Sequence, residues 1–288
     1  MGKDSTIEWT DHTFNPWWGC TKVSPACKHC YAETWARRFG MDLWGGRSPR
    51  REFGDAHWRE PLRWNRDAVL NKTRRRVFCA SMGDVFEPRR DLDASRERLW
   101  RLIEQTPGLD WLLLTKRPDR IAASVPWDNS WPENIWLGTT AESQLWAERR
   151  IPFLLQHRAA VRFVSCEPLL GHLDLTPWLP KLTKDRALDW VIVGGESGRK
   201  ARPMQPLWAR SLQQQCYQAN VAFHFKQWGN WAPIEPGTDT RANEKQGRQL
   251  LTINEFERVS KKTAGRMLDG RTWDQLPLPR PAKKRAAE

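Results

Sequence analysis

The sequence lacks long apolar runs, an apolar amino-terminal stretch and several familiar catalytic motifs. No run of about 18 apolar residues occurs, so we expect no membrane-spanning helix. The first residues, MGKDSTIEW, contain no apolar signal region, and we expect a cytoplasmic protein. The patterns G-x-S-x-G, H-E-x-x-H, G-x-G-x-x-G and the P-loop are all missing, which gives no support to a serine hydrolase, a zincin protease, a dinucleotide-binding fold or a P-loop NTPase.

Acidic residues are few relative to basic ones. The 288 residues include 47 Lys and Arg but only 34 Asp and Glu, giving a net charge of +13. A positive field of this size favours polyanions, and we expect nucleic acid as substrate or partner. The alternative is a protein whose surface is merely basic. Tyrosine is also scarce, with 2 Tyr against 19 Trp, and several Trp residues lie among arginines where stacking on bases is possible.

The six cysteines occur without a secretory signal. In a reducing compartment, clustered cysteines are typical of metal sites or catalysts rather than disulfides. The hydrophobic content of 39% is too high for a disordered chain. A chain of this length suits one α/β barrel, which runs to about 200–250 residues or more.

Short β-branched runs alternate with longer amphipathic ones, which predicts βα units and a parallel sheet. Six strands are clear and a seventh, placed first, is weaker: residues 77–81, 111–115, 135–139, 161–165, 190–194, 221–226 and, first in the chain, 13–18. Helices are predicted over residues 93–105, 142–156 and 206–218, with Asp91 or Asp93 as a cap for the first. We therefore expect an α/β fold, a partial (β/α) barrel of six or seven parallel strands.

The chain divides into a barrel, residues 1–228, an irregular carboxyl-terminal extension, 229–276, and a disordered tail, 277–288. Within the barrel, a basic insertion covers 45–76. This insertion holds ten basic and four acidic residues, a difference of +6, and two Trp residues, Trp58 and Trp64. We expect it to bind nucleic acid through arginines on phosphates and Trp on bases. The alternative is that its arginines pair with the barrel's own acids.

The strongest signal is the segment GCTKVSPACKHCYAE, in which Cys20, Cys27 and Cys30 form C-x6-C-x2-C. Three thiolates on one short loop can bind three irons of a [4Fe–4S] cubane and leave the fourth iron open for a cofactor or substrate. The competing interpretation is a zinc site in which His29 completes Cys3His, although His29 lies beside two of the ligands.

The run C-x-H-C-Y-A resembles the end of the cluster loop of radical S-adenosylmethionine (SAM) proteins, except that the first gap is six residues instead of three. The whole chain more closely resembles the phage-type three-cysteine-motif family, a family of unknown function with radical-SAM-like features. The motifs that carry this resemblance are NPWWGC (15–20), SMGDVF (81–86), LLLTKRP (112–118), GTTAES (138–143), SCEPLLG (165–171), GGESG (194–198), KQWGNW (226–231) and LDGRTWDQLP (268–277).

Polar residues follow one expected strand after another, and in βα barrels the active site lies at these carboxyl ends. The resemblance implies that these residues bind SAM. The methionine amino group would be held by the segment of Ser81, Gly83 and Asp84, and the ribose hydroxyls by Glu142 and Glu167. Lys116 and Arg117 would bind the SAM carboxylate or a substrate phosphate. Gly194 and Gly195 would allow close approach of adenine or substrate, and Thr140 and Glu196 complete the ring. Each carboxylate could instead cap a helix or pair with arginine.

Cys166 and Glu167 are the candidate catalytic residues, because both come at the end of an expected strand. Cys166 would donate a hydrogen atom or act as a nucleophile; the alternative is an ordinary buried cysteine. The expected function is an iron–sulfur, SAM-dependent radical enzyme acting on a nucleic acid or nucleotide, served by an electron donor such as flavodoxin or ferredoxin. Two alternatives stay open: a non-catalytic nucleic-acid-binding protein stabilised by zinc or a cluster, and a radical enzyme that modifies a protein partner.

Overall fold

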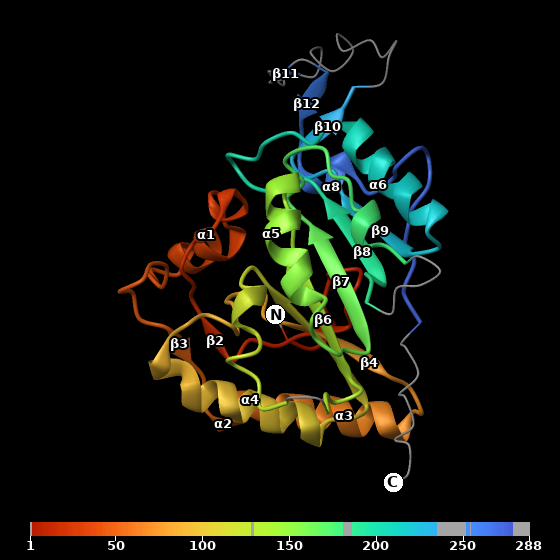
Figure 1. Ribbon diagram of the computed structural model, residues 1–288. Helices are drawn as coiled ribbons and strands as arrows, with labels where there is room; N and C mark the ends of the chain where they lie inside the picture. The colour runs from red at the N-terminus through yellow and green to blue at the C-terminus, as the bar shows by residue number, and fades with distance from the viewer. Residues whose placement is uncertain (1, 128–129, 181–185, 235–251, 254, 279–288) are drawn as a thin grey trace.

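Seven parallel strands hydrogen-bond in the order of the sequence and form a half-barrel, as Figure 1 shows for the computed structural model. The structure describes residues 2–127, 130–180, 186–234, 252–253 and 255–278. The strands of the half-barrel are β1 (His12–Thr13), β4 (Arg75–Cys79), β5 (Leu109–Thr115), β6 (Ile135–Thr140), β7 (Val161–Cys166), β8 (Trp190–Gly194) and β9 (Ala222–Gln227). The expected partial barrel of parallel strands is confirmed.

The first strand differs from the prediction over residues 13–18. Only His12–Thr13 pairs with β4, while Trp17–Trp18 forms β2, which pairs antiparallel with β3 (Arg51–Glu52) in a separate small sheet. Pro16 stands between them. Proline has no N–H to donate to a ladder, which explains why the parallel strand stops there and the chain turns away. The other six strands agree with the prediction to within two residues at each end.

The two faces of the half-barrel carry different apolar clusters. Alternate residues along the strands point into the barrel, where aromatic side chains dominate: Trp9, Phe78, Leu112, Trp136, Val161, Phe163, Trp190 and Ile192. Room for them is made by Gly138, where a Cβ would lie 2.3 Å from the Phe163 ring. The opposite face packs against helices in a larger cluster. Each buried aromatic removes roughly 200 Å² from water, worth on the order of 5 kcal/mol before entropy is counted.

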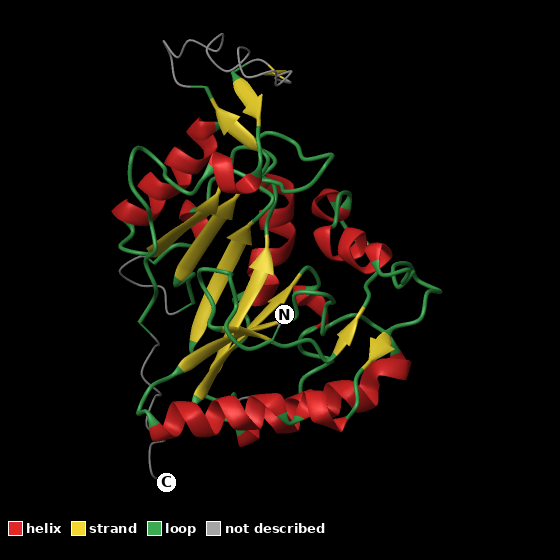
Figure 2. Ribbon diagram, turned by 180° about the vertical axis from the view of Figure 1, so that it is seen from behind, coloured by secondary structure: helices red, strands yellow, loops and turns green. Residues whose placement is uncertain are grey.

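The helices cover the convex face and the ends of the sheet (Figure 2). Their bounds are α1 (Tyr31–Arg38), α2 (Asp55–Trp58), α3 (Glu60–Leu70), α4 (Asp93–Gln105), α5 (Gln144–Leu154), α6 (Pro206–Gln218) and α8 (Lys261–Ala264). Two of the three predicted helices, α4 and α6, have the expected bounds, and α5 is shorter than predicted. No described helix has the length and apolar content needed to cross a bilayer.

The predicted aspartate cap of α4 is wrong. A short 3-10 turn, Arg90–Leu92, leads into the helix, so Leu92 occupies the cap position and no side chain bonds there. Asp93 is already inside the first turn and pairs with Arg96. The tighter turn supplies the entry that a capping side chain otherwise provides.

The segment over residues 45–76 folds into the body of the protein. It contains β3, α2 and α3, and its two Trp side chains are buried: Trp58 packs edge-on against Phe14, and Trp64 stacks on His12. These contacts correct the expectation that the two Trp residues stack on bases. Burying these large rings in the core gains more free energy than leaving them exposed on the surface.

The amino-terminal segment doubles back along β1 and crosses the concave side of the half-barrel, where Figure 2 places the N-terminus. Backbone hydrogen bonds join Gly2 to Thr13 and Ser5 to Asp11. Trp9 then enters the aromatic cluster inside the barrel. This segment thus fills part of the barrel from its open side.

The carboxyl-terminal extension forms a second small sheet and then returns to the barrel. The sheet consists of β10 (Trp231–Pro233), β12 (Phe256–Arg258) and β11 (Thr252–Ile253). Residues 273–275 run along the edge strand β9, where Phe225 donates to the Trp273 carbonyl at 2.9 Å. Covering an edge strand in this way removes its unpaired backbone groups. Of the expected tail, residues 279–288 lie outside the described residues.

Candidate active site

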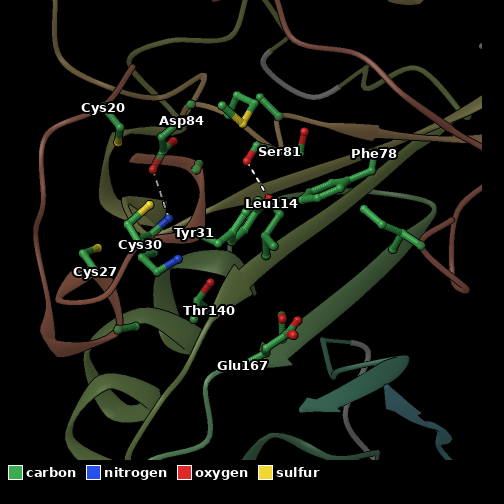
Figure 3. A pocket seen from close by; sticks show the side chains of 18 of the residues that line it. Cys20, Cys27, Cys30, Tyr31, Phe78, Ser81, Asp84, Leu114, Thr140 and Glu167 are labelled. Atoms are coloured by element: carbon green, nitrogen blue, oxygen red, sulfur yellow. Dashed lines mark hydrogen bonds between the residues drawn. The ribbon is translucent and has the colours of Figure 1, made fainter. Parts of the chain in front are cut away.

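A cavity of about 580 Å³ opens at the carboxyl ends of the strands (Figure 3). Its volume lies within the range of a small-molecule pocket. Residues from the cysteine loop, from the ends of β4 to β9 and from the amino-terminal segment line it. The sequence-predicted residues among them are Cys20, Cys27, Cys30, Ser81, Gly83, Asp84, Lys116, Arg117, Thr140, Glu167, Gly195 and Glu196. Three predicted residues, Glu142, Cys166 and Gly194, do not line the cavity.

The cysteine loop, residues 20–30, connects β2 to α1 and places all three thiols on the cavity. Cys20 follows β2 and bridges to Trp44, Cys27 ends a 3-10 turn, and Cys30 immediately precedes α1. All three side chains are half-buried. Figure 3 shows the three sulfur atoms on the same side of the cavity. The 3-10 turn over Pro25–Cys27 shortens the long C-x6-C segment and brings its ends to one side.

The thiols of Cys20 and Cys30 are poor acids in the absence of a bound cation. Burial raises the pKa of Cys20 to about 12, the Asp84 carboxylate adds to the rise, and the Arg117 guanidinium opposes it. Burial also raises the pKa of Cys30. Because thiolate is the ligand form, metal binding must release these protons.

Glu142 does not line the cavity; it hydrogen-bonds the backbone of the cysteine loop from within the protein core. Its side chain is fully buried, its Oε1 accepts a hydrogen bond from the Ala26 N–H at 3.1 Å, and its Oε2 pairs with Arg150 at 2.8 Å. This corrects its expected role as a ribose ligand: both carboxylate oxygens are used within the protein. Glu142 thus connects the Ala26 backbone, in the middle of the cysteine loop, to Arg150 of α5.

Glu196 and Arg202 fasten the loop from the β8 side. The Glu196 carboxylate contacts His29 Nδ1 at 3.2 Å and Arg202 Nε at 2.7 Å, and Arg202 also donates to the Pro25 carbonyl at 3.1 Å. Burial raises the pKa of Glu196, but the hydrogen bonds from Arg202 and His29 outweigh it, and the pKa lies below its usual value. Glu196 is therefore a charged anchor of the loop.

Arg117 and Asp84 fasten the loop from the β5 side. The Asp84 carboxylate accepts hydrogen bonds from the Thr115 hydroxyl at 2.8 Å, the Lys116 N–H at 3.1 Å and Arg117 Nη1 at 2.8 Å. A fourth bond comes from the Phe86 N–H at 3.1 Å. With both oxygens engaged, Asp84 holds Arg117 in place and has little acceptor capacity left for an amine ligand.

Lys116, the neighbour of Arg117, has a different position. Lys116 lines the cavity, and its ammonium has no acceptor among the described residues. Its positive charge opposes the rise in the pKa of Cys30 that burial causes. A half-buried cation without a partner suits an anionic ligand. Of the two basic residues that the sequence assigned to an anion, only Lys116 is thus available for one.

The β4 end contributes Ser81 and Gly83 to the wall above α1. The Tyr31 hydroxyl donates to the Ser81 carbonyl at 2.7 Å, as Figure 3 shows, and the Ser81 hydroxyl contacts the Asn15 amide at 3.1 Å. A Cβ at Gly83 would lie 3.2–3.3 Å from Trp17 and Gly19. The strand end therefore packs closely on the segment that leads into the cysteine loop.

On the opposite wall, Glu167 forms a polar group with Lys226 and Gln227. Lys226 Nζ lies 2.8 and 2.9 Å from the two carboxylate oxygens, and the Gln227 amide donates at 3.0 Å. A Cβ at Gly194 would lie 3.2 Å from the Glu167 side chain. Gly194 therefore gives space to Glu167 and not to a ligand. Gly195 is also required for packing, since a Cβ there would meet the Trp228 carbonyl at 1.9 Å.

Cys166 points away from the cavity. It is fully buried in the cluster between the sheet and the helices, while its neighbours Ser165 and Glu167 line the cavity. Successive residues of a strand face opposite sides, so Cys166 and Glu167 cannot both face the barrel interior. Burial raises the pKa of the Cys166 thiol well above its usual range. The position corresponds to an ordinary core cysteine.

Several residues of the cavity were not predicted. Tyr31 could have been found, because it follows Cys30 directly. Phe78 and Leu114 come from inside predicted strands, and only their inward direction shows that they line the cavity. The amino-terminal residues 2–7 also line it. No local pattern signals their place, because it depends on a return of the chain across the barrel.

The three thiols are the ligand type that an iron–sulfur cluster uses, and the described residues contain no ready zinc site. Among the residues that the structure describes, no three His, Cys, Asp or Glu side chains converge closely enough to hold one metal ion. A tetrahedral zinc would require sulfurs about 3.8 Å apart, given Zn–S bonds of about 2.3 Å. In a cubane each thiolate binds a different iron, and the sulfurs lie farther apart. His29, the expected fourth zinc ligand, is turned to Glu196.

The sequence from residue 4 to residue 277 matches the family described as "Protein of unknown function (DUF5131)". No curated protein matches significantly. A solved structure of spore photoproduct lyase complexed with dinucleoside spore photoproduct is similar, with 11% sequence identity over 91% of this chain and 72% of that chain and a TM-score of 0.45. So distant a likeness is no basis for an argument about activity. Because the family match covers nearly the whole sequence, the chain belongs to the DUF5131 family.

Proposed function

We propose that the protein is an iron–sulfur, SAM-dependent radical enzyme that acts on a nucleic acid or nucleotide. The observation that carries the proposal is the placement of three half-buried thiols from one loop on a cavity at the carboxyl ends of a parallel half-barrel. Active sites of βα barrels lie at this end. We also propose that the chain is a member of the phage-type three-cysteine-motif family, which its sequence motifs resemble.

Cys20, Cys27 and Cys30 would hold a [4Fe–4S] cluster, with one iron free of protein ligands. A bound cluster would supply one electron for the reductive cleavage of SAM, and the radical chemistry that follows would act on a C–H bond of the substrate. The electron comes from a low-potential donor such as a flavodoxin or ferredoxin. The protein's part is to hold the loop rigid through Glu142, Glu196 and Arg117.

The chain's own polar groups would orient SAM in the rest of the cavity. The Lys116 ammonium, which has no acceptor in the described part of the chain, would bind the methionine carboxylate, and the Ser81–Gly83 segment and Thr140 line the same cavity. The Glu167–Lys226 pair lies on the opposite wall, where it could accept from ribose hydroxyls or position the substrate. Apolar walls from Tyr31, Phe78 and Leu114 would exclude water from the reacting groups (Figure 3).

The proposed polyanionic substrate is supported by the net charge of +13 and by the basic side chains around the cavity. Five lysines line the cavity: Lys3, Lys22, Lys116, Lys226 and Lys261. Lys22 pairs with Glu33 and Lys226 with Glu167, whereas Lys116 and Lys261 have no acceptor among the described residues. Cations at the mouth of the cavity would bind phosphates and bring one nucleotide to the site.

The proposal is tested on protein that is purified and reconstituted without oxygen. We expect a brown protein with about four iron and four sulfide per chain, and release of 5′-deoxyadenosine from SAM after reduction with dithionite. Cys20→Ala, Cys27→Ala and Cys30→Ala should each remove the cluster. Cys166→Ala is the matched control, because its thiol faces the core, and it should keep full iron content.

Two results would overturn the proposal. Stoichiometric zinc in protein produced with ample iron would identify a different metal site. Full iron with no SAM binding, measured by calorimetry and by electron paramagnetic resonance, would leave an iron–sulfur protein of another class.

A further inference from the structure

Arg117 is a buried cation in hydrogen-bond contact with a predicted cluster ligand. Its Nη1 lies 3.7 Å from Cys20 Sγ and donates to Asp84 at 2.8 Å, and its Nη2 donates to the Thr21 carbonyl at 2.7 Å. The residue is only 7% exposed. One guanidinium thus joins a buried carboxylate, the backbone of the cysteine loop and a cysteine sulfur.

The position of Arg117 is fixed from both sides. Asp84 is itself held by Thr115, by Lys116 N–H and by Phe86 N–H, so the carboxylate cannot follow a moving guanidinium. The Arg117 N–H is in turn bonded to the Thr115 hydroxyl at 2.9 Å. The planar guanidinium fork keeps its charge and its N–H direction under all ordinary conditions.

Arg202 provides a natural comparison. It also pairs with a buried carboxylate, Glu196, and also donates to a carbonyl of the cysteine loop, that of Pro25 at 3.1 Å. The structure gives it no hydrogen bond to a cysteine sulfur, and its side chain is 30% exposed. The two arginines hold opposite sides of one loop, and the sulfur contact distinguishes them.

We propose that Arg117 is a positioning residue that raises the reduction potential of the cluster at Cys20, Cys27 and Cys30; the inference rests on the proposed function. Reduction adds one electron, taken from a low-potential one-electron donor, and makes the cluster more negative. A positive N–H donor aimed at a ligand sulfur stabilises the reduced form more than the oxidised form. Burial strengthens the effect because screening is weak there.

The experiment measures the midpoint potential of the full chain, reconstituted without oxygen and titrated with dithionite in the absence of SAM, followed by electron paramagnetic resonance. Arg117→Gln should lower the equilibrium constant for reduction about tenfold, which is about 59 mV for a one-electron couple. Arg117→Lys keeps the charge and should lie between the two. Arg202→Gln, which removes a charge without touching sulfur, should shift the potential much less.

The iron and sulfide content distinguishes a failure of the proposed function from a failure of the proposed role of Arg117. Wild-type protein that binds no cluster overturns the proposed function and this inference together. Equal potentials for wild type and Arg117→Gln at full iron content overturn the inference alone, as does an Arg202→Gln shift of the same size. If Arg117→Gln fails to assemble a cluster, the potential of Arg117→Lys decides, and a value equal to wild type counts against the inference.

Discussion

The cysteine loop, residues 20–30, and the basic segment, residues 45–76, are the two regions that stand out most in the sequence, and the fold treats them differently. The loop lies at the carboxyl ends of the strands, and all three of its thiols line the cavity. The basic segment ends in Arg74, Arg75 and Arg76 at the start of β4, which is the opposite end of a parallel sheet. Strand β4 therefore has the paired arginines at its amino end and the candidate site at its carboxyl end.

The three arginines at the end of the basic segment are paired within the protein. Arg74 pairs with Asp110 at 2.6 Å, and Arg75 and Arg76 pair with Asp11 at 3.5 and 3.2 Å. This corrects the expectation that these three arginines bind phosphates. An excess of charge along the sequence says that cations are present; which of them are free depends on the acids that the fold brings beside them.

The largest expected difference between the two regions is the loss of stability when the acidic partner of an arginine is removed. Glu142→Ala removes one partner of a fully buried pair and leaves Arg150 without compensation under the cysteine loop. We expect a loss of about 3–5 kcal/mol in the free energy of unfolding, measured by urea denaturation. Asp110→Ala is the matched variant, because Asp110 on β5 pairs with Arg74 of the basic segment. Half-exposed Arg74 can turn to water, and a loss of about 1 kcal/mol is expected. Equal losses would contradict the distinction between the two regions.

A smaller loss of stability is expected when Asp11, the acid that pairs with Arg75 and Arg76, is replaced. Burial raises the pKa of Asp11, but backbone and side-chain hydrogen bonds from Arg76 outweigh it, and the pKa lies below its usual value. A lowered folded-state pKa contributes stability above the unfolded pKa of about 3.9, and this contribution is lost as the pH falls through the folded value. Asp11→Asn should therefore be about 1 kcal/mol less stable than wild type at pH 7.

The pH dependence gives that prediction its control. Denaturation of wild type and Asp11→Asn should give converging stabilities as the pH falls from about 4 towards 2, because protonated Asp11 then resembles the amide. A difference that stays constant across this range would mean that the Asp11 charge does not contribute, and that the two arginines are free for other partners.

The smallest expected effect is that of the basic segment on nucleic-acid binding. Replacing Arg74, Arg75 and Arg76 with Gln should leave the salt dependence of binding unchanged, since these side chains are paired within the fold. Replacing Lys116 and Lys261, which line the cavity and have no acceptor among the described residues, should flatten the plot of log K against log salt by about 0.7–0.9 for each phosphate that is no longer neutralised. Electrophoretic shifts across salt measure both. The reverse outcome would place the polyanion at the amino end of the sheet.

The sequence by itself determined the sheet and the position of the candidate site along the chain. Continuous apolar runs such as 190–194, rich in β-branched residues, are typical of inner strands, and polar residues such as Asp84, Lys116 and Glu167 come where those strands end. Parallel strands bring such residues to one edge, so their convergence on the cavity follows from local patterns. The C-x6-C-x2-C spacing likewise fixed the three thiols on one loop.

Only the tertiary structure decided what each polar residue does. Glu142, Asp84 and Glu196 look alike as strand-end carboxylates, yet all three are engaged by partners far away in the sequence, such as Ala26, Arg117 and His29. The same holds for Cys166, whose direction is set by strand parity relative to Glu167. A local pattern tells which residues reach the site, but hydrogen-bond capacity is consumed by neighbours that only folding brings together.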